Sequence, residues 1–315
     1  MRINGLLIVD KPEGMTSLGV VKEVKYQFKI EKAGHIGTLD PFATGVLPIV
    51  MNEGTKLVPF LEENPKEYEA TLKLGEETAT DDPEGEVISQ KSWERVTSEQ
   101  IHSAFESFLG KIRQTPPMFS AKKVCGKPLY RLARKGMEVD REEKEVEIFD
   151  LQIKDLDPPH VAFKVSCSRG TYIRVLARDI GRKIGCGAHL FKLRRIRSGS
   201  FLLSHAVPWH ELKKISGGEA LAPWLISLKE ALSGWPEVVG NDCLVKKIRF
   251  GQEMRVRDFL SEDLRSFEKG QWLKMTSPEE ELVAILRSEI RGSEIYRADP
   301  EKVAFQTVRV FNPYS

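Results

Sequence analysis

Residues 34–48 read GHIGTLDPFATGVLP, a glycine-rich segment with Asp40 near its centre and His35 five residues upstream. Its glycines permit backbone dihedrals that other residues avoid and let a ligand approach closely. Because Pro41 follows Asp40 directly, Asp40 is biased away from the helical region. The pattern therefore predicts an active-site loop that holds a carboxylate on a turn. A turn in which Asp40 only caps its own backbone amides fits the spacing equally well.

Length and composition set the frame for this loop. A chain of 315 residues with 41% hydrophobic content can bury a full core and is predicted to form two domains. The net charge, 48 minus 46 or +2, gives no overall signal for nucleic acid. The four cysteines form no CxxC pair and no His lies at metal-ligand spacing beside them, which predicts reduced thiols, no zinc and a cytoplasmic protein. Charges interrupt residues 1–30, so we expect no signal peptide or membrane span.

Hydrophobic spacing predicts the elements around the loop. From Ser17, a predicted N-cap, apolar residues recur at helical spacing as far as Phe28. Residues 66–74 alternate apolar and polar side chains, as in a half-buried strand, and on pattern alone Tyr68 is a core aromatic on its apolar face. Residues 78–85, TATDDPEG, favour an acidic surface turn. We also expect a helix over 98–109, a helix beginning near Arg174, and strands over 5–9, 146–153 and 161–167.

Positive charge is unevenly distributed. Residues 111–141 contain nine Lys or Arg against two acidic residues, interspersed with Met118, Phe119 and Tyr130. This composition suits a loop that closes on a phosphate backbone, although an ordinary solvated surface has the same appearance. Residues 164–197 contain ten Lys or Arg against Asp179 alone. About nine net charges predict a surface that releases counterions on binding RNA.

The 34–48 segment resembles the TruB family of bacterial pseudouridine synthases, which modify uridine 55 in the tRNA T loop and carry their nucleophilic Asp in GHxGTLDPxATGVLP. The segment departs from this motif only mildly, since Ile36 stands where the family often has Thr. PPMFSAKKVCGKPLYRLARKG resembles the family's RNA-gripping loop, GTYIR its second chemical motif, and CGAHLFKLRR continues the match. The resemblance implies an α+β pseudouridine synthase fold, with a mixed, largely antiparallel central sheet flanked by helices and loops.

The resemblance also implies roles for particular residues. Asp40 is the expected nucleophile, Arg174 of GTYIR its partner, and Tyr68 of the K-x-Y motif the ring that stacks on the target uracil. Without the resemblance, the pattern predicts equally well that Arg174 contacts an RNA phosphate. The remaining expected site residues, which support the substrate or the network around it, are Lys11, His35, Asp82, Tyr172 and Leu193. Leu193 is expected against the flipped base, although an ordinary strand leucine fits its pattern.

The domain organisation follows from a composition shift near Trp235. We predict a catalytic domain over 1–234, with an RNA-gripping loop over 111–145, and a small β-rich domain over 235–315. The second region resembles a PUA-type RNA-binding domain, carried by residues 248–252, IRFGQ. We expect a helix near 242–250 and strands around 254–256, 271–275 and 282–286 there.

The chemistry implied is isomerisation of uridine without a cofactor. A carboxylate that attacks must be ionised, and a guanidinium beside Asp40 is expected to lower its pKa and fix its orientation. The expected partner is the tRNA T-arm, with no metal, no membrane and a monomeric protein. Three other readings remain open: a guide-RNA-dependent synthase subunit, a non-catalytic RNA chaperone on the same fold, and a glycosidase-type hydrolase that uses Asp82 as its second acid.

Overall fold

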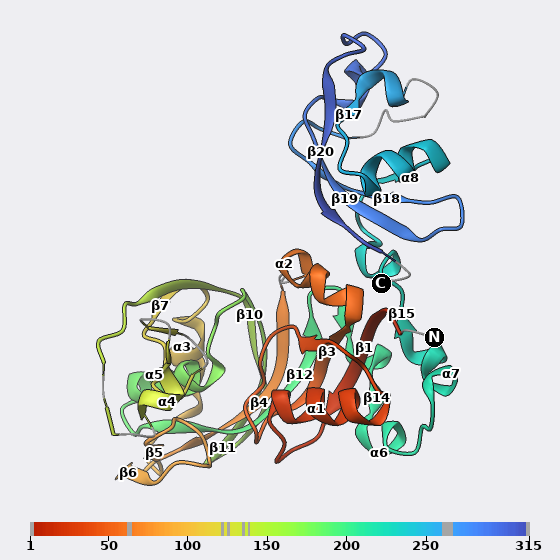
Figure 1. The fold of residues 1–315 in the computed structure, drawn as a ribbon. Coiled ribbons are helices and arrows are strands. Elements are labelled where there is room, and N and C mark those ends of the chain that lie inside the picture. The colour runs from red at the N-terminus through yellow and green to blue at the C-terminus, as the bar shows by residue number, and fades with distance from the viewer. Residues whose placement is uncertain are drawn as a thin grey trace.

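The computed structural model describes residues 3–61, 65–120, 123–124, 127–133, 136–137, 139–259 and 267–312. These residues form a large central sheet flanked by helices and a second, smaller sheet in a C-terminal lobe (Figure 1). Strand pairing in the central sheet is mixed and largely antiparallel, since only β1 with β14 and β3 with β12 run parallel. The predicted α+β class is confirmed.

The central sheet has short strands at its two edges. Its order is β14 (Val207–Pro208), β1 (Gly5–Lys11), β3 (Thr44–Met51), β12 (Ala188–Ser198), β4 (Lys66–Leu74), β11 (His160–Cys167), β10 (Lys144–Asp157) and β7 (Gly110–Gln114). Three short strands pair beside this path: β2 (Ala33–His35) with β3, β13 (Phe201–Leu202) with β12, and β15 (Leu225–Ile226) with β1. This order places β4 and β12, which are more than 110 residues apart in sequence, side by side.

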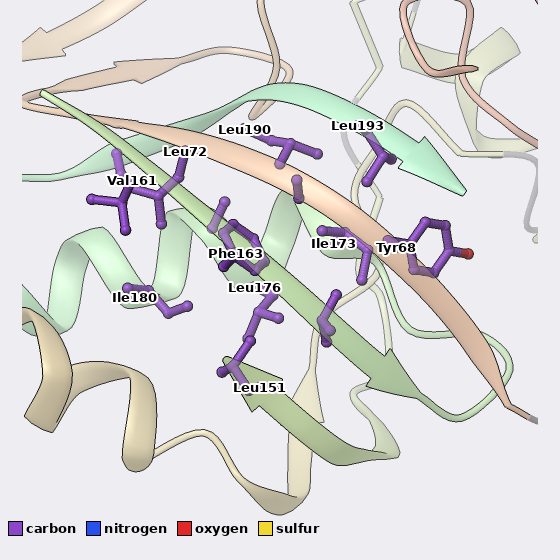
Figure 2. Close-up of a cluster of buried hydrophobic side chains, with 14 of the residues drawn as sticks. Tyr68, Leu72, Leu151, Val161, Phe163, Ile173, Leu176, Ile180, Leu190 and Leu193 are labelled. Carbon is purple, nitrogen blue, oxygen red and sulfur yellow. The ribbon is translucent and has the colours of Figure 1, made fainter. Parts of the chain in front are cut away.

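The alternation predicted for 66–74 is present in β4. Tyr68, Ala70, Leu72 and Leu74 are buried, whereas Glu67, Glu69, Thr71 and Lys73 retain exposure. A strand alternates in this way because successive side chains point to opposite faces of the sheet. The buried face packs on α5 (Ile173–Ile184) and α3 (Ser98–Glu106) in one hydrophobic cluster. Figure 2 shows Tyr68 at one end of this cluster, with its hydroxyl oxygen directed away from the other side chains.

The helices cover the sheet and connect its strands. α1 (Ser17–Gln27) buries Val20, Val21 and Val24 against β1 and β3. Four further helices of this part are short: α2 (Val58–Leu61), α4 (Leu129–Ala133), α6 (Trp209–Leu212) and α7 (Gly218–Leu221). Two hairpins complete this part, β5 (Glu76–Thr78) with β6 (Val87–Gln90) and β8 (Lys123–Val124) with β9 (Lys127–Pro128). The second hairpin and α4 lie in the segment predicted to grip RNA, part of which is outside the described residues.

Two helix boundaries differ from the prediction. The N-cap of α1 is Thr16, whose hydroxyl accepts a hydrogen bond from the Gly19 amide at 2.9 Å, and not Ser17. Either residue type can cap a helix, so sequence alone does not choose between neighbours. α3 ends at Glu106, because residues 107–109 turn into β7.

The C-terminal lobe contains its own sheet and core. The strand order is β16 (Glu237–Val239), β18 (Trp272–Thr276), β19 (Leu282–Ser288), β20 (Val303–Val310) and β17 (Met254–Arg255), with α8 (Asp242–Arg249) packed beside it. The predicted helix and three strands are present, while β16 and β20 were not predicted. The lobe, blue at the top of Figure 1, stands apart from the central sheet and meets it near α2 and β15.

A shared core joins the lobe to the central sheet. Leu282, Ile285 and Phe311 of the lobe pack in one cluster with Leu6 and Ile8 of β1. Hydrogen bonds reinforce the junction, with Lys56 Nζ donating to the Val310 carbonyl at 3.1 Å and the Asn312 amide to Glu53 Oε2 at 2.8 Å. The last strand of the central sheet ends at Ile226 and the first strand of the lobe begins at Glu237, but the hydrophobic core continues from one sheet to the other.

None of the helices in the described ranges is long and apolar enough to span a bilayer.

Candidate active site

A pocket of about 660 Å³ opens where the 34–48 loop meets β4, β12 and the start of α5. Five of the predicted site residues line it: Asp40, Tyr68, Tyr172, Arg174 and Leu193. The other three, Lys11, His35 and Asp82, stand outside its wall. The sheet order brings together residues from four separate parts of the chain, which local sequence patterns do not predict.

Two glycines give the Asp40 loop its shape. Gly45 has φ +101°, and a Cβ there would lie 2.2 Å from the backbone oxygen of Arg195 on β12. Gly37 has φ +69°, and a Cβ there would lie 3.1 Å from the Arg195 guanidinium. The left-handed conformation and the close approach both exclude ordinary side chains. Gly34, by contrast, meets neither condition.

Lys11, the last residue of β1, supports this loop. Its side chain is fully buried, and Nζ donates to the carbonyls of Pro12 at 2.8 Å, Met15 at 2.6 Å and Pro41 at 3.0 Å. An ammonium has three N–H donors and no acceptor, so each donor has one carbonyl. Burial lowers the pKa of Lys11 to about 8, while the Asp40 carboxylate opposes this shift. Lys11 therefore holds the turn after Asp40 and lies outside the substrate pocket.

Ser17 holds the other side of the turn and was not predicted as a site residue. Its buried hydroxyl accepts from the Leu39 amide and donates to the Leu39 carbonyl, both at 2.9 Å. The residue before Asp40 is thus fixed through both of its backbone polar groups. The sequence offered one signal for this role. Thr16 and Ser17 can both cap the helix, and the one that is not the cap can form hydrogen bonds with another part of the backbone.

Arg174 is the centre of the charged network. Its guanidinium is 4% exposed and contacts Asp40 through Nε to Oδ2 at 2.8 Å and through Nη2 to Oδ1 at 3.3 Å. Two parallel contacts of this kind fix the orientation of a carboxylate as well as its charge. Nη2 also donates to the Phe119 carbonyl at 2.7 Å and Nη1 to the Thr80 carbonyl at 2.9 Å. The expected pairing of Arg174 with Asp40 is present.

Asp82 is the second carboxylate on Arg174, although its sequence pattern favoured a surface turn. It is 3% exposed and accepts from Arg174 Nη1 at 3.0 Å. The Glu84 amide donates to its Oδ1 at 3.1 Å, and the Thr80 hydroxyl contacts the same oxygen. The turn between β5 and β6 is therefore folded inward onto α5. Since Asp82 does not line the pocket, Asp40 is the carboxylate of this network that faces it.

The pKa of Asp40 is raised, whereas the sequence led us to expect that Arg174 would lower it. Its side chain keeps 32% of its surface exposed, but it lies at the floor of a pocket whose walls displace water. This burial raises the pKa of Asp40 above its ordinary value and outweighs the Arg174 guanidinium, which acts in the opposite direction. The nearby Asp82 charge raises it further. The predicted lowering by Arg174 exists, but it is not the dominant effect.

Tyr68 forms part of the pocket wall and of the core behind it. It is 8% exposed, and burial raises the pKa of its hydroxyl. Arg195, its register partner on β12, acts against this rise in pKa. Arg195 is 1% exposed and donates from Nε to the Val46 carbonyl at 2.7 Å and from Nη2 to the Gly37 carbonyl at 2.9 Å. Arg195 thus ties Tyr68 to the Asp40 loop, a role that its place in a charge run did not suggest.

Tyr172 and Leu193 both line the pocket, from the start of α5 and from β12. Tyr172 is the N-cap position of α5, and the Gln114 side chain fixes its backbone by accepting from its amide at 3.0 Å and donating to its carbonyl at 3.2 Å. Leu193 is 8% exposed on β12 and presents an apolar surface. His35 lies on β2, where burial lowers the pKa of its imidazole and Nδ1 has no hydrogen-bond partner within the described ranges.

The two basic segments are less available than their composition indicated. Six of the ten cations in 164–197 contact carboxylates: Lys164 and Arg197 on Glu67, Arg174 on Asp40 and Asp82, Arg178 on Asp81 and Asp179, Arg182 on Glu77, and Arg194 on Asp10. Arg195 is buried. In the other segment, Lys111 and Arg113 pair with Glu145 and Glu143. Fewer of the cations in 164–197 are therefore free of carboxylate partners than the net charge of about nine indicates.

Where the chain is described, no group of three or more His, Cys, Asp and Glu side chains is placed to hold a metal ion.

Comparisons with known proteins identify the family of this chain. A sequence profile described as TruB family pseudouridylate synthase (N terminal domain) matches residues 25–173, and one described as tRNA pseudouridylate synthase B C-terminal domain matches residues 174–233. The tRNA pseudouridine synthase B of Syntrophotalea carbinolica is 39% identical over 310 residues, 98% of each chain. That of Geobacter sulfurreducens is 49% identical over 230 residues, 73% of this chain and 76% of the relative.

Among solved structures, a chain of a Cbf5–Nop10–Gar1 complex is similar, with a TM-score of 0.71 and 26% identity over 98% of this chain and 85% of that chain. The two profiles meet between Ile173 and Arg174, at the start of α5 and inside the single central sheet. The second profile thus begins within the catalytic fold and ends before the C-terminal lobe. On the extent of these matches, the chain belongs to the TruB family of pseudouridylate synthases.

Proposed function

We propose that this protein isomerises uridine to pseudouridine in tRNA, at position 55 of the T loop, and that Asp40 is its catalytic carboxylate. The observation that carries the proposal is the Asp40–Arg174 pair on the floor of a pocket flanked by Tyr68 and Leu193. The relatives named tRNA pseudouridine synthase B support tRNA as the substrate.

The reaction requires one carboxylate and no change of oxidation state. The bond between ribose C1′ and uracil N1 breaks, the base rotates, and a bond from C1′ to C5 forms. The proton at C5 is lost and N1 ends protonated, so substrate and product are isomers. Asp40 can assist as a nucleophile at uracil C6, as a nucleophile at C1′, or as a base at C2′. Each route requires the ionised carboxylate.

The other pocket residues receive roles that match their positions. The target base must leave its stack, at a cost of a few kcal/mol that stacking on protein side chains partly offsets. Tyr68 offers the ring for this contact and Leu193 the opposing apolar surface. Arg174 orients Asp40, Asp82 holds Arg174, and Lys11 holds the turn. His35, whose Nδ1 has no partner in the described part of the chain, is the proposed contact to the RNA from which the base was extracted.

The test is direct. Purified protein is incubated with unmodified tRNA, and pseudouridine is mapped at single-nucleotide resolution. We expect one modified position in the T loop with wild type and none with Asp40→Asn. A wild-type preparation that binds tRNA and leaves every uridine unmodified would favour the RNA-chaperone reading. Modification at other uridines only would refute the position.

A guide-RNA-dependent synthase subunit is the second candidate, because a chain of a Cbf5–Nop10–Gar1 complex matches at a TM-score of 0.71. Relatives at 39% and 49% identity named tRNA pseudouridine synthase B favour the first candidate. The same assay separates them, since a guide-dependent subunit modifies nothing when the purified protein and tRNA are the only macromolecules present.

We further propose that residues 1–234 carry catalysis and that 235–315 add affinity for tRNA through a PUA-like lobe. All eight proposed site residues precede the boundary. The core shared across it indicates that a chain ending near Ser233 is less stable than the whole. The protein is proposed to act as a monomer on the T-arm, in the cytoplasm, where tRNA is available.

A further inference from the structure

Ser120, a residue that lines the active-site pocket, has a hydroxyl that is buried in the free protein. The residue lines the pocket and is 6% exposed, and its Oγ has no hydrogen-bond partner within the described residues. Burying a hydroxyl without a compensating hydrogen bond is unfavourable, so such groups are few in folded proteins. An unpaired hydroxyl in the wall of a pocket points to a ligand that completes its hydrogen bonding.

The position of Ser120 follows from the network that orients Asp40. Arg174 Nη2 donates to the carbonyl of Phe119, the preceding residue, at 2.7 Å and to Asp40 Oδ1 at 3.3 Å. Arg141 Nη1 donates to the Pro116 carbonyl at 3.1 Å and anchors the other end of the segment. The guanidinium that aligns the catalytic carboxylate therefore also places Ser120.

A serine hydroxyl is suited to meet an incoming group at this position. It both donates and accepts, and rotation about one bond moves it among three staggered positions. In the free protein Oγ is shielded from water. Rotation about the Cα–Cβ bond can turn it toward the pocket that Ser120 lines, and its partner there is a group that enters this pocket.

We propose that Ser120 is a substrate-binding residue, whose hydroxyl forms a hydrogen bond with an oxygen of the target nucleotide once that nucleotide lies beside Asp40. The inference rests on the proposed function and deepens it. A uridine offers two sources of such an oxygen, the ribose 2′-hydroxyl and the carbonyls of the base. The bond forms only in the complex, so Ser120 contributes to binding and turnover and not to the stability of the free protein.

The test is Ser120→Ala, assayed on a T-arm stem-loop RNA. We expect kcat/KM to fall about tenfold, the loss of one hydrogen bond. The melting temperature should stay the same or rise, because the substitution removes an unpaired polar group from a buried position. An unchanged kcat/KM overturns the proposal. A clear loss of melting temperature also overturns it, since the hydroxyl would then have a partner in the protein.

Two buried serines in the C-terminal lobe provide matched controls. Ser277 is 5% exposed and also has an unpartnered Oγ within the described ranges, so Ser277→Ala should leave both melting temperature and kcat/KM unchanged. Ser288 is 1% exposed and donates to the Glu268 carbonyl at 2.5 Å. Ser288→Ala should lower the melting temperature and leave kcat/KM unchanged. Only the Ser120 variant is expected to lose activity while keeping its stability.

A second measurement identifies the oxygen. Dissociation constants of wild type and Ser120→Ala are compared for the stem-loop RNA and for the same RNA with 2′-deoxyuridine at the target position. If the difference between the two proteins vanishes with the deoxy RNA, Ser120 bonds the 2′-hydroxyl. If it persists, Ser120 bonds the base. Equal affinities for the all-ribose RNA overturn the proposal, even if wild type forms no pseudouridine and the proposed function fails separately.

Discussion

The α5 wall and the β12 wall of the pocket each contribute one buried arginine, and the two differ in their partners. Arg174 on α5 contacts the carboxylates of Asp40 and Asp82. Arg195 on β12 donates to the carbonyls of Val46 and Gly37 and is paired across the strands with Tyr68, with no carboxylate of the described residues among its partners. Arg174 is therefore paired with charged side chains, whereas Arg195 is hydrogen-bonded to backbone carbonyls.

This difference separates two functions of buried positive charge. A guanidinium between two carboxylates fixes the orientation of a reacting group, so its replacement affects the reaction first. A guanidinium among carbonyls fixes the shape of the chain, so its replacement leaves buried acceptors unpaired and affects stability first. Burial lowers the pKa of Arg195, which is the cost that its hydrogen bonds offset.

The largest expected effect is that of Asp40→Asn. Turnover should fall by more than about 10³-fold, since the isosteric amide cannot attack or take a proton. Stability should not fall at neutral pH. Because burial raises the folded-state pKa of Asp40, stability is lost as pH rises from the ordinary pKa of an aspartate to this raised value, and the amide removes that loss.

Pseudouridine formation, tRNA binding and thermal unfolding are measured on the same preparation. Asp82→Asn is the matched control, because it also removes a carboxylate from Arg174 but leaves the group that faces the pocket. Substantial turnover by pure Asp40→Asn would refute the assignment of Asp40.

Arg174→Lys should rank second. An ammonium keeps the charge but cannot make two parallel contacts with Asp40 and reach the carbonyls of Thr80 and Phe119, so kcat should fall on the order of 10²-fold. Arg194→Lys is the control, because Arg194 lies on β12 outside the pocket wall and pairs with Asp10 at 2.6 Å. Single-turnover rates at saturating RNA distinguish the two variants. Equal rates for both would mean that Arg174 acts only as a charge.

Arg195→Met tests the other half of the comparison. Two buried carbonyls lose their donor, which should lower the free energy of unfolding by about 3 kcal/mol. Turnover should fall less than in Arg174→Lys, provided that the protein is folded at the assay temperature. Urea denaturation of wild type, Arg195→Met and Arg194→Met measures the effect. If Arg195→Met is as stable as wild type, the buried carbonyls have other donors and the contrast between the two walls is lost.

The smallest expected effect is a shift in pH dependence. Asp40 must be ionised, so kcat/KM should decline as pH falls through its raised pKa, at a higher pH than for an ordinary aspartate. Asp82→Asn removes a negative charge that raises the pKa of Asp40, and the acidic decline should therefore move to lower pH. Profiles of kcat/KM against pH for the two proteins show the direction. A shift to higher pH would mean that Asp82 acts on Asp40 mainly by holding Arg174.

Local patterns predicted those parts of the site that depend on neighbouring residues. The alternation in β4 placed Tyr68 on the buried face, and the motifs around Asp40 and Arg174 identified the central pair. Asp82 was read as a surface residue on pattern alone, because an acidic turn folded inward looks like one facing water until its partner is known. Ser17 and Arg195 were missed for the same reason, since their partners lie 22 and more than 140 residues away.

The sequence by itself determined the periodic elements, the strained glycine loop and the family. Side-chain period and backbone dihedrals depend on residues only a few positions apart. Only the tertiary structure decided which charges are neutralised. The cations of 164–197 meet carboxylates at positions 10 to 82, because β12 lies between β3 and β4 and α5 lies against the β5–β6 turn. Strand order is a property of the whole chain, so two arginines of a run that reads as an RNA surface, Arg174 and Arg195, become in the fold buried parts of the active site.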